Sequence, residues 1–194
     1  QSCSSLTSIA IPASVGEVGA AAFWQCTKMT SAAFAAGSKQ VKIGDNLFTQ
    51  CYSLTSVTLP QSIDRVGEGM FMNCGLLVKI EIPEGAESIA ASAFASCAAL
   101  TDIIIPQSVT KIEAAVFGNC PLKDIYFTGT EEQWNAIQKL GDTPAAIAKA
   151  TVHYNYSPTS PPSPEPDDSD QNNGSNSGGS NNSGSSSGGS NNSG

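Results

Sequence analysis

The sequence predicts a repeat solenoid, in which a right-handed coil carries a parallel sheet on one face and ends in a small α/β cap. Three features predict this fold: the spacing of the cysteines, an apolar pattern that keeps their phase, and a change of character after the last one. Successive cysteines are separated by 23, 25, 23, 23 and 23 residues. They are Cys3, Cys26, Cys51, Cys74, Cys97 and Cys120. A period of roughly 20 to 50 residues is typical of solenoids, whose units bury their apolar side chains only by stacking.

Each repeat contains one predicted strand. Apolar residues stand six and eight positions after the cysteine, as Ile80 and Ile82 do after Cys74, with a polar or small residue between them. This alternation is the period of a half-buried strand. In four repeats a proline follows directly and ends the strand, because proline has no N–H to donate. These prolines are Pro12, Pro60, Pro83 and Pro106. Stacking of the coils places successive strands about 4.8 Å apart in a parallel sheet.

The return leg of each coil ends in a phenylalanine, three residues before the next cysteine. The five are Phe23, Phe48, Phe71, Phe94 and Phe117. Coils in register therefore predict one column of phenylalanines and one of cysteines. The repeat that starts at Cys26 departs from the pattern, since Ala35 replaces the proline and two extra residues lie within 36–40. We expect a local loop there in a solenoid that continues past it.

The segment after the last cysteine predicts a short sixth strand, because Ile125 and Phe127 keep the strand phase after a one-residue deletion. We therefore expect a solenoid of about five 23-residue coils and a short sixth over 1–128. The different sequence of 129–156 predicts a cap, which covers the apolar end that a solenoid otherwise exposes. Residues 157–194 contain no hydrophobic residue and are rich in Pro, then in Gly, Ser and Asn, so they predict a disordered linker.

Two helices and a strand are predicted within the cap. Thr130 and Gln133 match a capping box, in which each side chain satisfies a free backbone N–H of the first helical turn. The apolar positions of this helix are Trp134, Ile137 and Leu140. The proline that follows Thr143 predicts a second helix start, continued over 145–150. Residues 151–156 then alternate as a final strand.

Several of these motifs resemble a known family. Residues 3–12 and 51–60 read Cys-Ser-Ser-Leu-Thr-Ser-Ile-Ala-Ile-Pro and Cys-Tyr-Ser-Leu-Thr-Ser-Val-Thr-Leu-Pro, and Ala-Phe-x-x-Cys recurs at 22–26 and 93–97. They resemble the leucine-rich repeats of the BspA type, found on bacterial and some protist cell surfaces. The resemblance covers residues 1–156. It implies a secreted or cell-surface location and an adhesion role, with a host-matrix or cell-surface protein as partner.

Composition excludes two kinds of partner. The chain has 17 acidic and 9 basic residues, a net charge of −8, and no cluster of basic residues. Nucleic-acid binders need such a cluster, so we expect no nucleic-acid partner. The longest apolar runs, 20–24 and 32–36, are far shorter than the roughly 20 residues that cross a bilayer. We therefore expect no membrane insertion in this segment. We also expect the chain to be a monomer.

The cysteines have two interpretations. One cysteine per coil at a constant phase predicts a column of buried thiols, in which cysteine acts as a small apolar residue. Disulfides between adjacent coils remain the alternative, because the α carbons would lie within bonding range. The sequence has no CxxC pair, and His153 is its single histidine. We therefore expect no metal site and no cofactor.

Catalysis has two candidate sites. His153 lies on the predicted cap strand, where its neighbours indicate an exposed position, and we expect no catalytic role for it. Asp102 and Asp124 share a phase on adjacent coils, about 5 Å apart, which is within the separation used by glycoside-cleaving carboxylates. A β-helix enzyme that acts on polysaccharide is therefore one alternative. The simpler interpretation is that Lys79 neutralises Asp102 and Asp124 faces water, so we expect no enzyme activity.

The outward side of the predicted sheet offers a candidate protein contact near the cap. Ile104 and Tyr126 form an apolar and aromatic centre with charged residues around it, which is the composition expected of a protein interface. The six candidate residues are Lys79, Glu81, Asp102, Ile104, Asp124 and Tyr126. The leading hypothesis is an extracellular protein-recognition module without catalytic activity. A rigid spacer that presents another domain is the main alternative.

Overall fold

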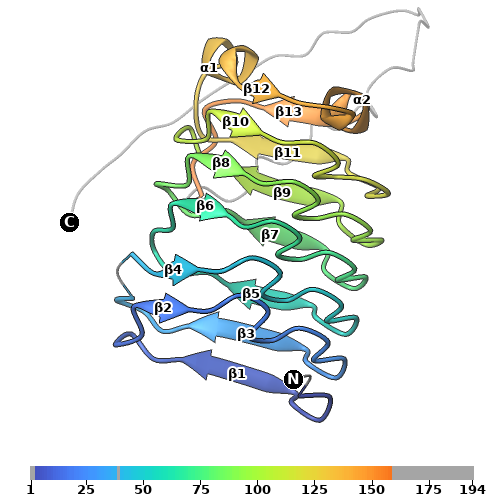
Figure 1. Ribbon diagram of the computed structural model, residues 1–194. Coiled ribbons are helices and arrows are strands. Elements are labelled where there is room, and N and C mark those ends of the chain that lie inside the picture. Colours follow the sequence, from blue (N-terminus) through green and yellow to red (C-terminus); the bar gives the residue numbers. More distant parts are fainter. Residues whose placement is uncertain (1–2, 39, 159–194) are drawn as a thin grey trace, which may run out of the picture. The chain divides into compact units, whose positions relative to one another are not determined.

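The computed structural model of the protein describes residues 3–38 and 40–158, which form one compact unit. The predicted linker lies outside the described residues from position 159 onward. Figure 1 shows a parallel-sheet solenoid, whose coils each carry a long strand on one side and a short strand on the other. It has about six turns. The predicted fold class is confirmed.

The long strands pair in parallel with their neighbours along the solenoid. They are β1 (Ser8–Ile11), β3 (Ser31–Phe34), β5 (Ser56–Thr58), β7 (Lys79–Glu81), β9 (Asp102–Ile105), β11 (Asp124–Phe127) and β13 (Thr151–His153). Equivalent positions of neighbouring repeats lie opposite each other, so that Ile103 pairs with both Ile80 and Ile125. Pro106 follows β9 directly, as expected of a residue that ends a strand. The register inferred from the apolar phase is confirmed.

The short strands form a second set of parallel pairs on the return legs. They are β2 (Glu17–Val18), β4 (Lys42–Ile43), β6 (Arg65–Val66), β8 (Ser88–Ile89), β10 (Lys111–Ile112) and β12 (Gln138–Lys139). Val66, Ile89 and Ile112 are fully buried and extend the core to this side. The sequence pattern does not predict this second sheet, because two residues are too few to show the alternation of a strand.

Two columns of like side chains run through the core. The rings of Phe23, Phe48, Phe71, Phe94 and Phe117 stack with centroids 5.4, 5.6 or 5.8 Å apart. Cys26, Cys51, Cys74 and Cys97 are fully buried, Cys120 is half-buried and Cys3 is exposed. The thiols bond to the phenylalanine column, as where Cys74 Sγ donates to Phe48 O at 3.2 Å. The predicted rows of phenylalanines and of buried thiols are confirmed.

The strand pairing is interrupted on both sides of the third coil, which carries β5 and β6. Within the described residues, no ladder joins β5 to β7 or β4 to β6, whereas β5 pairs with β3 and β6 with β8 (Figure 1). An isolated bridge joins Gln40 to Ser62. The turns remain bonded across both interruptions, since Phe48 N donates to Met70 O at 2.9 Å and Phe71 N donates to Ala93 O at 2.8 Å. The solenoid therefore continues past the loop at 36–40, as expected, although each sheet is divided in two.

The first cap helix begins where the sequence predicts and ends earlier. In α1 (Glu131–Ala136), Gln133 N donates to Thr130 Oγ1 and Thr130 N donates to Gln133 Oε1, which confirms the capping box. The extended backbone of Ile137 ends the helix, and β12 then pairs with β10. The predicted continuation of the helix through Leu140 is therefore wrong. Pairing with β10 satisfies the backbone groups that a longer helix would bond internally.

The remaining cap elements are also shorter than predicted. The second helix, α2 (Thr143–Ile147), starts at the expected position but ends before the predicted residue 150. The final strand β13 ends at His153, not at residue 156. Trp134, Ile137 and Ile147 are buried in the core, and the Trp134 ring lies edge-on to Phe127 with centroids 5.3 Å apart. These side chains cover the apolar end of the last coil.

Candidate partner-binding face

The candidate site lies on the long-strand side, where β7, β9, β11 and β13 are adjacent. The register pairs are Lys79 with Asp102, Asp102 with Asp124, Glu81 with Ile104, and Ile104 with Tyr126. Alternate residues of a strand point to the same face, so these positions form two neighbouring columns on one side of the sheet. The structure thus brings the six predicted residues together.

Tyr126 is the centre of an aromatic cluster. Its ring stacks on His153 with centroids 4.7 Å apart, and the ring of Tyr156 lies 4.8 Å away in a tilted arrangement. Lys79 Nζ lies 5.6 Å from the centroid of the Tyr126 ring, within the range of a cation–π interaction. The three aromatic side chains are half-buried, so each still presents part of its surface to solvent.

Asp124 is bound to the cap. Its Oδ1 atom lies 2.8 Å from Nε2 of His153, and the two side chains are 33% and 39% exposed. The expectation that Asp124 simply faces water is therefore wrong, and His153 is less exposed than its sequence neighbours indicate. The cause is β13, which pairs with β11 and places His153 opposite Tyr126.

Lys79 does not neutralise Asp102, contrary to the sequence-based expectation. Asp102 belongs to no ion pair formed by residues 3–38 and 40–158, and it accepts a hydrogen bond from Thr101 Oγ1 at 2.5 Å. The Lys79 ammonium lies against the Tyr126 ring instead. Asp102 and Asp124 are register neighbours, as the glycosidase alternative requires, but both carboxylates are engaged in local contacts.

Ile104 is buried, with 3% of its surface exposed, although its phase predicts an outward position. It lies on β9, between the strands that carry Lys79 and Tyr126. The contact between these two side chains spans β9, which accounts for the burial of Ile104. Ile104 therefore packs beneath the surface and is not itself accessible to a partner.

The sequence analysis did not assign His153 and Tyr156 to this face. A signal for His153 exists, because Thr151, Val152 and His153 repeat the polar, apolar, polar order of 124–126. Aligning the two segments predicts β13 as a further strand of the sheet. No repeat position corresponds to Tyr156, which follows the last strand and is fixed by a hydrogen bond from its N to Phe127 O at 3.0 Å.

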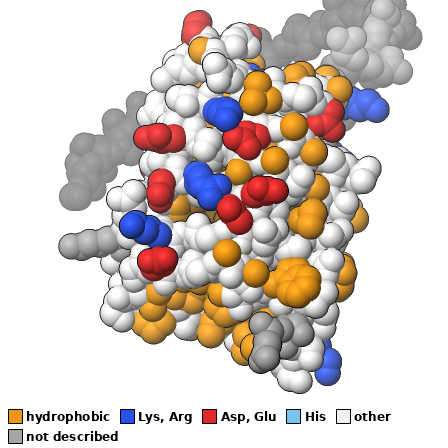
Figure 2. Space-filling view, in the orientation of Figure 1, with side chains coloured by type: hydrophobic (Ala, Val, Ile, Leu, Met, Phe, Trp, Pro, Cys, Tyr) orange, Lys and Arg blue, Asp and Glu red, His pale blue; other side chains and the backbone are white. Residues whose placement is uncertain are grey.

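Two ion pairs lie on the opposite, short-strand side. Figure 2 shows acidic and basic side chains interspersed on this side. Arg65 Nη2 lies 2.8 Å from Asp45 Oδ1, and Lys111 Nζ lies 2.7 Å from Glu113 Oε1. Asp45 Oδ1 also accepts a hydrogen bond from Glu68 N at 2.8 Å. These carboxylates bond to backbone of neighbouring coils, so they stabilise the stacking.

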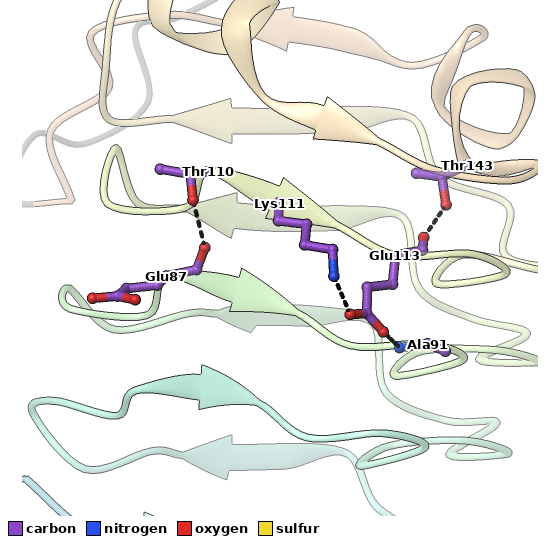
Figure 3. Close-up of polar contacts among 6 residues, drawn as sticks. All are labelled: Glu87, Ala91, Thr110, Lys111, Glu113 and Thr143. Atoms are coloured by element: carbon purple, nitrogen blue, oxygen red, sulfur yellow. Dashed lines mark hydrogen bonds and ion pairs between the residues drawn. The ribbon is translucent and has the colours of Figure 1, made fainter.

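Glu113 illustrates this use of charge (Figure 3). Its Oε1 atom accepts a hydrogen bond from Lys111, and its Oε2 atom accepts one from Ala91 N at 3.1 Å. The hydrogen bond from Lys111 and that from Ala91 lower the pKa of the Glu113 carboxyl. The backbone oxygen of Glu113 accepts a further bond from Thr143 Oγ1 at 2.6 Å, which joins the coil to the cap.

The buried thiols in the middle of the column have low reactivity. Burial raises the pKa of the Cys51 thiol to about 12 and raises that of Cys74 as well. Protonated thiols are poor metal ligands and poor nucleophiles. In the described part of the chain, no group of three or more His, Cys, Asp or Glu residues is placed to hold a metal ion. In the same part, no helix has the length and apolar character needed to cross a membrane.

The stacked coils, their two rows of parallel strands and the partly exposed aromatic cluster define a repeat-type β-solenoid. Residues 32–136 match six copies of the BspA type leucine-rich repeat region. This match covers more than half of the chain, which therefore belongs to the BspA-type leucine-rich repeat family, as its motifs indicate. No curated protein matches the chain.

Solved structures of bacterial proteins are similar to the chain. A leucine-rich cell surface protein of Faecalibacterium prausnitzii is 36% identical, with a TM-score of 0.65 over 69% of this chain and 35% of its own length. A leucine-rich repeat protein of Bacteroides ovatus is 27% identical, with a TM-score of 0.51 over 77% of this chain and 42% of that one. The leucine-rich repeat protein of T. pallidum is 24% identical, with a TM-score of 0.55 and coverages of 70% and 69%, and shows the fold alone. The chain thus spans about a third of the F. prausnitzii protein.

Proposed function

We propose that this chain is a secreted or cell-surface module that recognises a protein partner and has no catalytic activity. Membership of a leucine-rich repeat family supports protein interaction as its general role, because solenoids present extended binding surfaces. The F. prausnitzii relative is described as a cell surface protein, which supports the proposed location. Adhesion to a host-matrix or cell-surface protein is the specific form of the proposal.

The observation that carries the proposal is the aromatic cluster on the long-strand side and its charged surroundings. Protein interfaces concentrate aromatic side chains at the centre and charged residues at the rim. The partner face, as we define it, consists of Lys79, Glu81, Asp102, Asp124, Tyr126, His153 and Tyr156. Ile104 supports it from below. The short-strand side is the weaker candidate for partner binding, because its Arg65 and Lys111 side chains are already bound to carboxylates.

A rigid spacer that presents another domain is the second candidate. The phenylalanine column favours it, because the rings stack without interruption from the first coil to the last full one. A spacer needs no accessible binding surface and would retain no specific partner. The two functions therefore differ in a single measurable property.

The test immobilises the full-length chain and measures its retention of purified extracellular-matrix proteins and of cell-surface extracts. We expect a protein to be retained, and Tyr126→Ala to weaken its binding at least about tenfold, since aromatic residues at the centre of an interface dominate its affinity. Lys79→Glu tests the charged rim at a position with no ion pair among the described residues. Matched controls are Tyr52→Ala and Lys28→Glu, which alter exposed residues outside the partner face.

If the unaltered chain retains no protein, the result would favour the rigid-spacer function. Equal weakening by the control variants would contradict the assignment of the partner face. Circular dichroism of each variant separates loss of binding from loss of folding. Cleavage of a glycan by the parent chain, abolished by Asp102→Asn with Asp124→Asn, would contradict the non-catalytic part of the proposal.

A further inference from the structure

A pocket of about 400 Å³ opens where the long-strand side is interrupted. Residues 57–61 of the third coil form one wall, and Glu81, Pro83 and Glu84 of the fourth coil form the other. Paired strands lie about 4.8 Å apart and leave no such space between them. The missing ladder between β5 and β7 therefore accounts for the pocket.

The lining of the pocket is apolar inside and polar at its opening. Pro60 is buried, and the half-buried apolar residues around it are Val57, Leu59 and Pro83. The exposed lining residues are Thr58, Gln61, Glu81 and Glu84. A ligand side chain that lies along this pocket can pack its stem on the apolar residues and place a charged end beside the carboxylates at the opening.

The two carboxylates at the opening have no cationic partner within the described ranges. Glu81 has no hydrogen bond or ion pair there, and Glu84 accepts one bond, from Thr128 Oγ1 at 3.2 Å. The cations on the same two coils are engaged elsewhere. Lys79 lies against Tyr126, and Arg65 is bound to Asp45. The opening of the pocket therefore carries uncompensated negative charge.

The strand edges beside the pocket also present backbone groups. Ile82 N donates to Ile104 O at 3.0 Å, so this peptide group faces β9. Peptide groups alternate in direction along a strand, and that of Glu81 therefore faces β5, with which no described residue of β7 forms a ladder. These backbone groups can hydrogen-bond to a ligand that enters the pocket, although β5 and β7 lie too close together for a third strand between them.

We propose that this pocket, the β5–β7 pocket, binds an arginine side chain of an extended segment of the protein partner. The methylene stem packs on the apolar interior, as long basic side chains do. The guanidinium bonds to Glu81 and Glu84 with the planar fork that suits carboxylates, which lysine lacks. This site rests on the proposed function, to which it adds the chemistry of the partner at one defined point.

The probe is the peptide acetyl-Thr-Val-Arg-Val-Thr-amide, titrated into the ¹⁵N-labelled full-length chain. A second peptide with norleucine in place of arginine keeps the stem and removes the charge. We expect the arginine peptide to shift the amide resonances of 57–61 and 81–84. The norleucine peptide should bind at least about tenfold more weakly, since charge-assisted bonds to two carboxylates are lost.

Variants test the two carboxylates directly. Glu81→Gln with Glu84→Gln keeps the shape of the pocket and removes its charge, and should weaken the arginine peptide at least about tenfold. Glu17→Gln with Glu87→Gln is the matched control, because it removes the same charge from exposed positions outside the pocket. We expect the control to bind within about twofold of the unaltered chain, since exposed charges at a distance are screened.

Each alternative outcome overturns the assignment. Equal binding of the norleucine peptide would contradict recognition of the arginine charge. Undiminished binding of the arginine peptide by the Glu81 and Glu84 double variant would contradict it as well. Shifts confined to the amide resonances of Tyr126, His153 and Tyr156 would show that the peptide binds outside the β5–β7 pocket. No shifts at roughly 10 mM peptide would show that the pocket does not bind it. These results leave the proposed function standing, because it is tested separately by retention of a whole protein and by Tyr126→Ala.

Discussion

At the scale of single residues, the recurrent cysteine fills a position that is small, apolar and next to a carbonyl oxygen. The thiols of Cys51, Cys74, Cys97 and Cys120 donate to the oxygen of a phenylalanine 28, 26, 26 and 26 residues earlier, at 3.1, 3.2, 3.1 and 2.9 Å. Alanine would leave that oxygen with one donor, the backbone N of the cysteine three residues later, and a larger side chain would not fit a close-packed interior. Cysteine meets both demands with one atom.

The same packing predicts how the thiols react. We expect iodoacetamide at pH 8 to alkylate the exposed Cys3 first and to leave Cys51 and Cys74 unmodified in the folded chain. A pKa raised to about 12 leaves about one Cys51 thiol in ten thousand as the reactive thiolate at this pH, and burial blocks access as well. Peptide mapping by mass spectrometry measures the order of modification. Cys3→Ser should remove the fast phase, and modification of Cys74 as fast as Cys3 would contradict the buried column.

At the scale of the elements, the sequence predicts features that repeat and misses those that depend on neighbours. The long strands and their register follow from the apolar phase, and the start of α1 follows from Thr130 and Gln133. The end of α1 does not, because β12 is formed by pairing with a distant strand, β10. The short strands are not predicted either, because two residues are too few to show the alternation of a strand.

The residues of the candidate site also fall into those that the sequence predicts and those that it misses. Tyr126 and its charged neighbours are found from their phase on the sheet, whereas His153 and Tyr156 are brought in by the cap. Ile104 has the phase of an outward residue, yet the contact of Lys79 with Tyr126 spans its strand. The β5–β7 pocket has no signal in either repeat, because it arises from pairing that is absent between them.

The capping box of α1 gives a prediction for one element. Thr130→Ala removes the side-chain acceptor of Gln133 N and should lower the free energy of unfolding by about 1 kcal/mol. Urea unfolding followed by circular dichroism should show a lower midpoint at an unchanged slope. Thr7→Ala, at an exposed position outside any helix, is the control. An equal shift in both variants would mean that the cap bond contributes nothing.

At the scale of the whole molecule, the third coil joins two halves of the solenoid. Its long strand β5 pairs with the coils before it, and its short strand β6 pairs with the coils after it. The stacked rings of Phe48 and Phe71 and the bond from Phe48 N to Met70 O cross the interruption. Because each half shares this coil, the interruption divides the sheets without dividing the core.

This arrangement predicts a local difference in hydrogen exchange. Thr58, Glu81 and Ile104 each stand seven residues after a cysteine, and their amides face the preceding coil. Thr58 and Ile104 belong to paired strands there, whereas no described residue of β5 pairs with Glu81. We expect the Glu81 amide to exchange at least about tenfold faster than that of Thr58, which corresponds to a difference of about 1.4 kcal/mol in opening free energy.

Thr58 is the decisive comparison, because its side chain is exposed like that of Glu81 and only the pairing of its strand differs. Exchange rates measured by NMR and normalised to those of an unstructured peptide remove the effect of side-chain type. Equal protection of Thr58 and Glu81 would mean that β5 and β7 pair in solution, which would also close the β5–β7 pocket. Fast exchange at both the Thr58 and the Glu81 amide would instead mean that the whole third coil is unstable, since an unstable coil exposes all of its amides together.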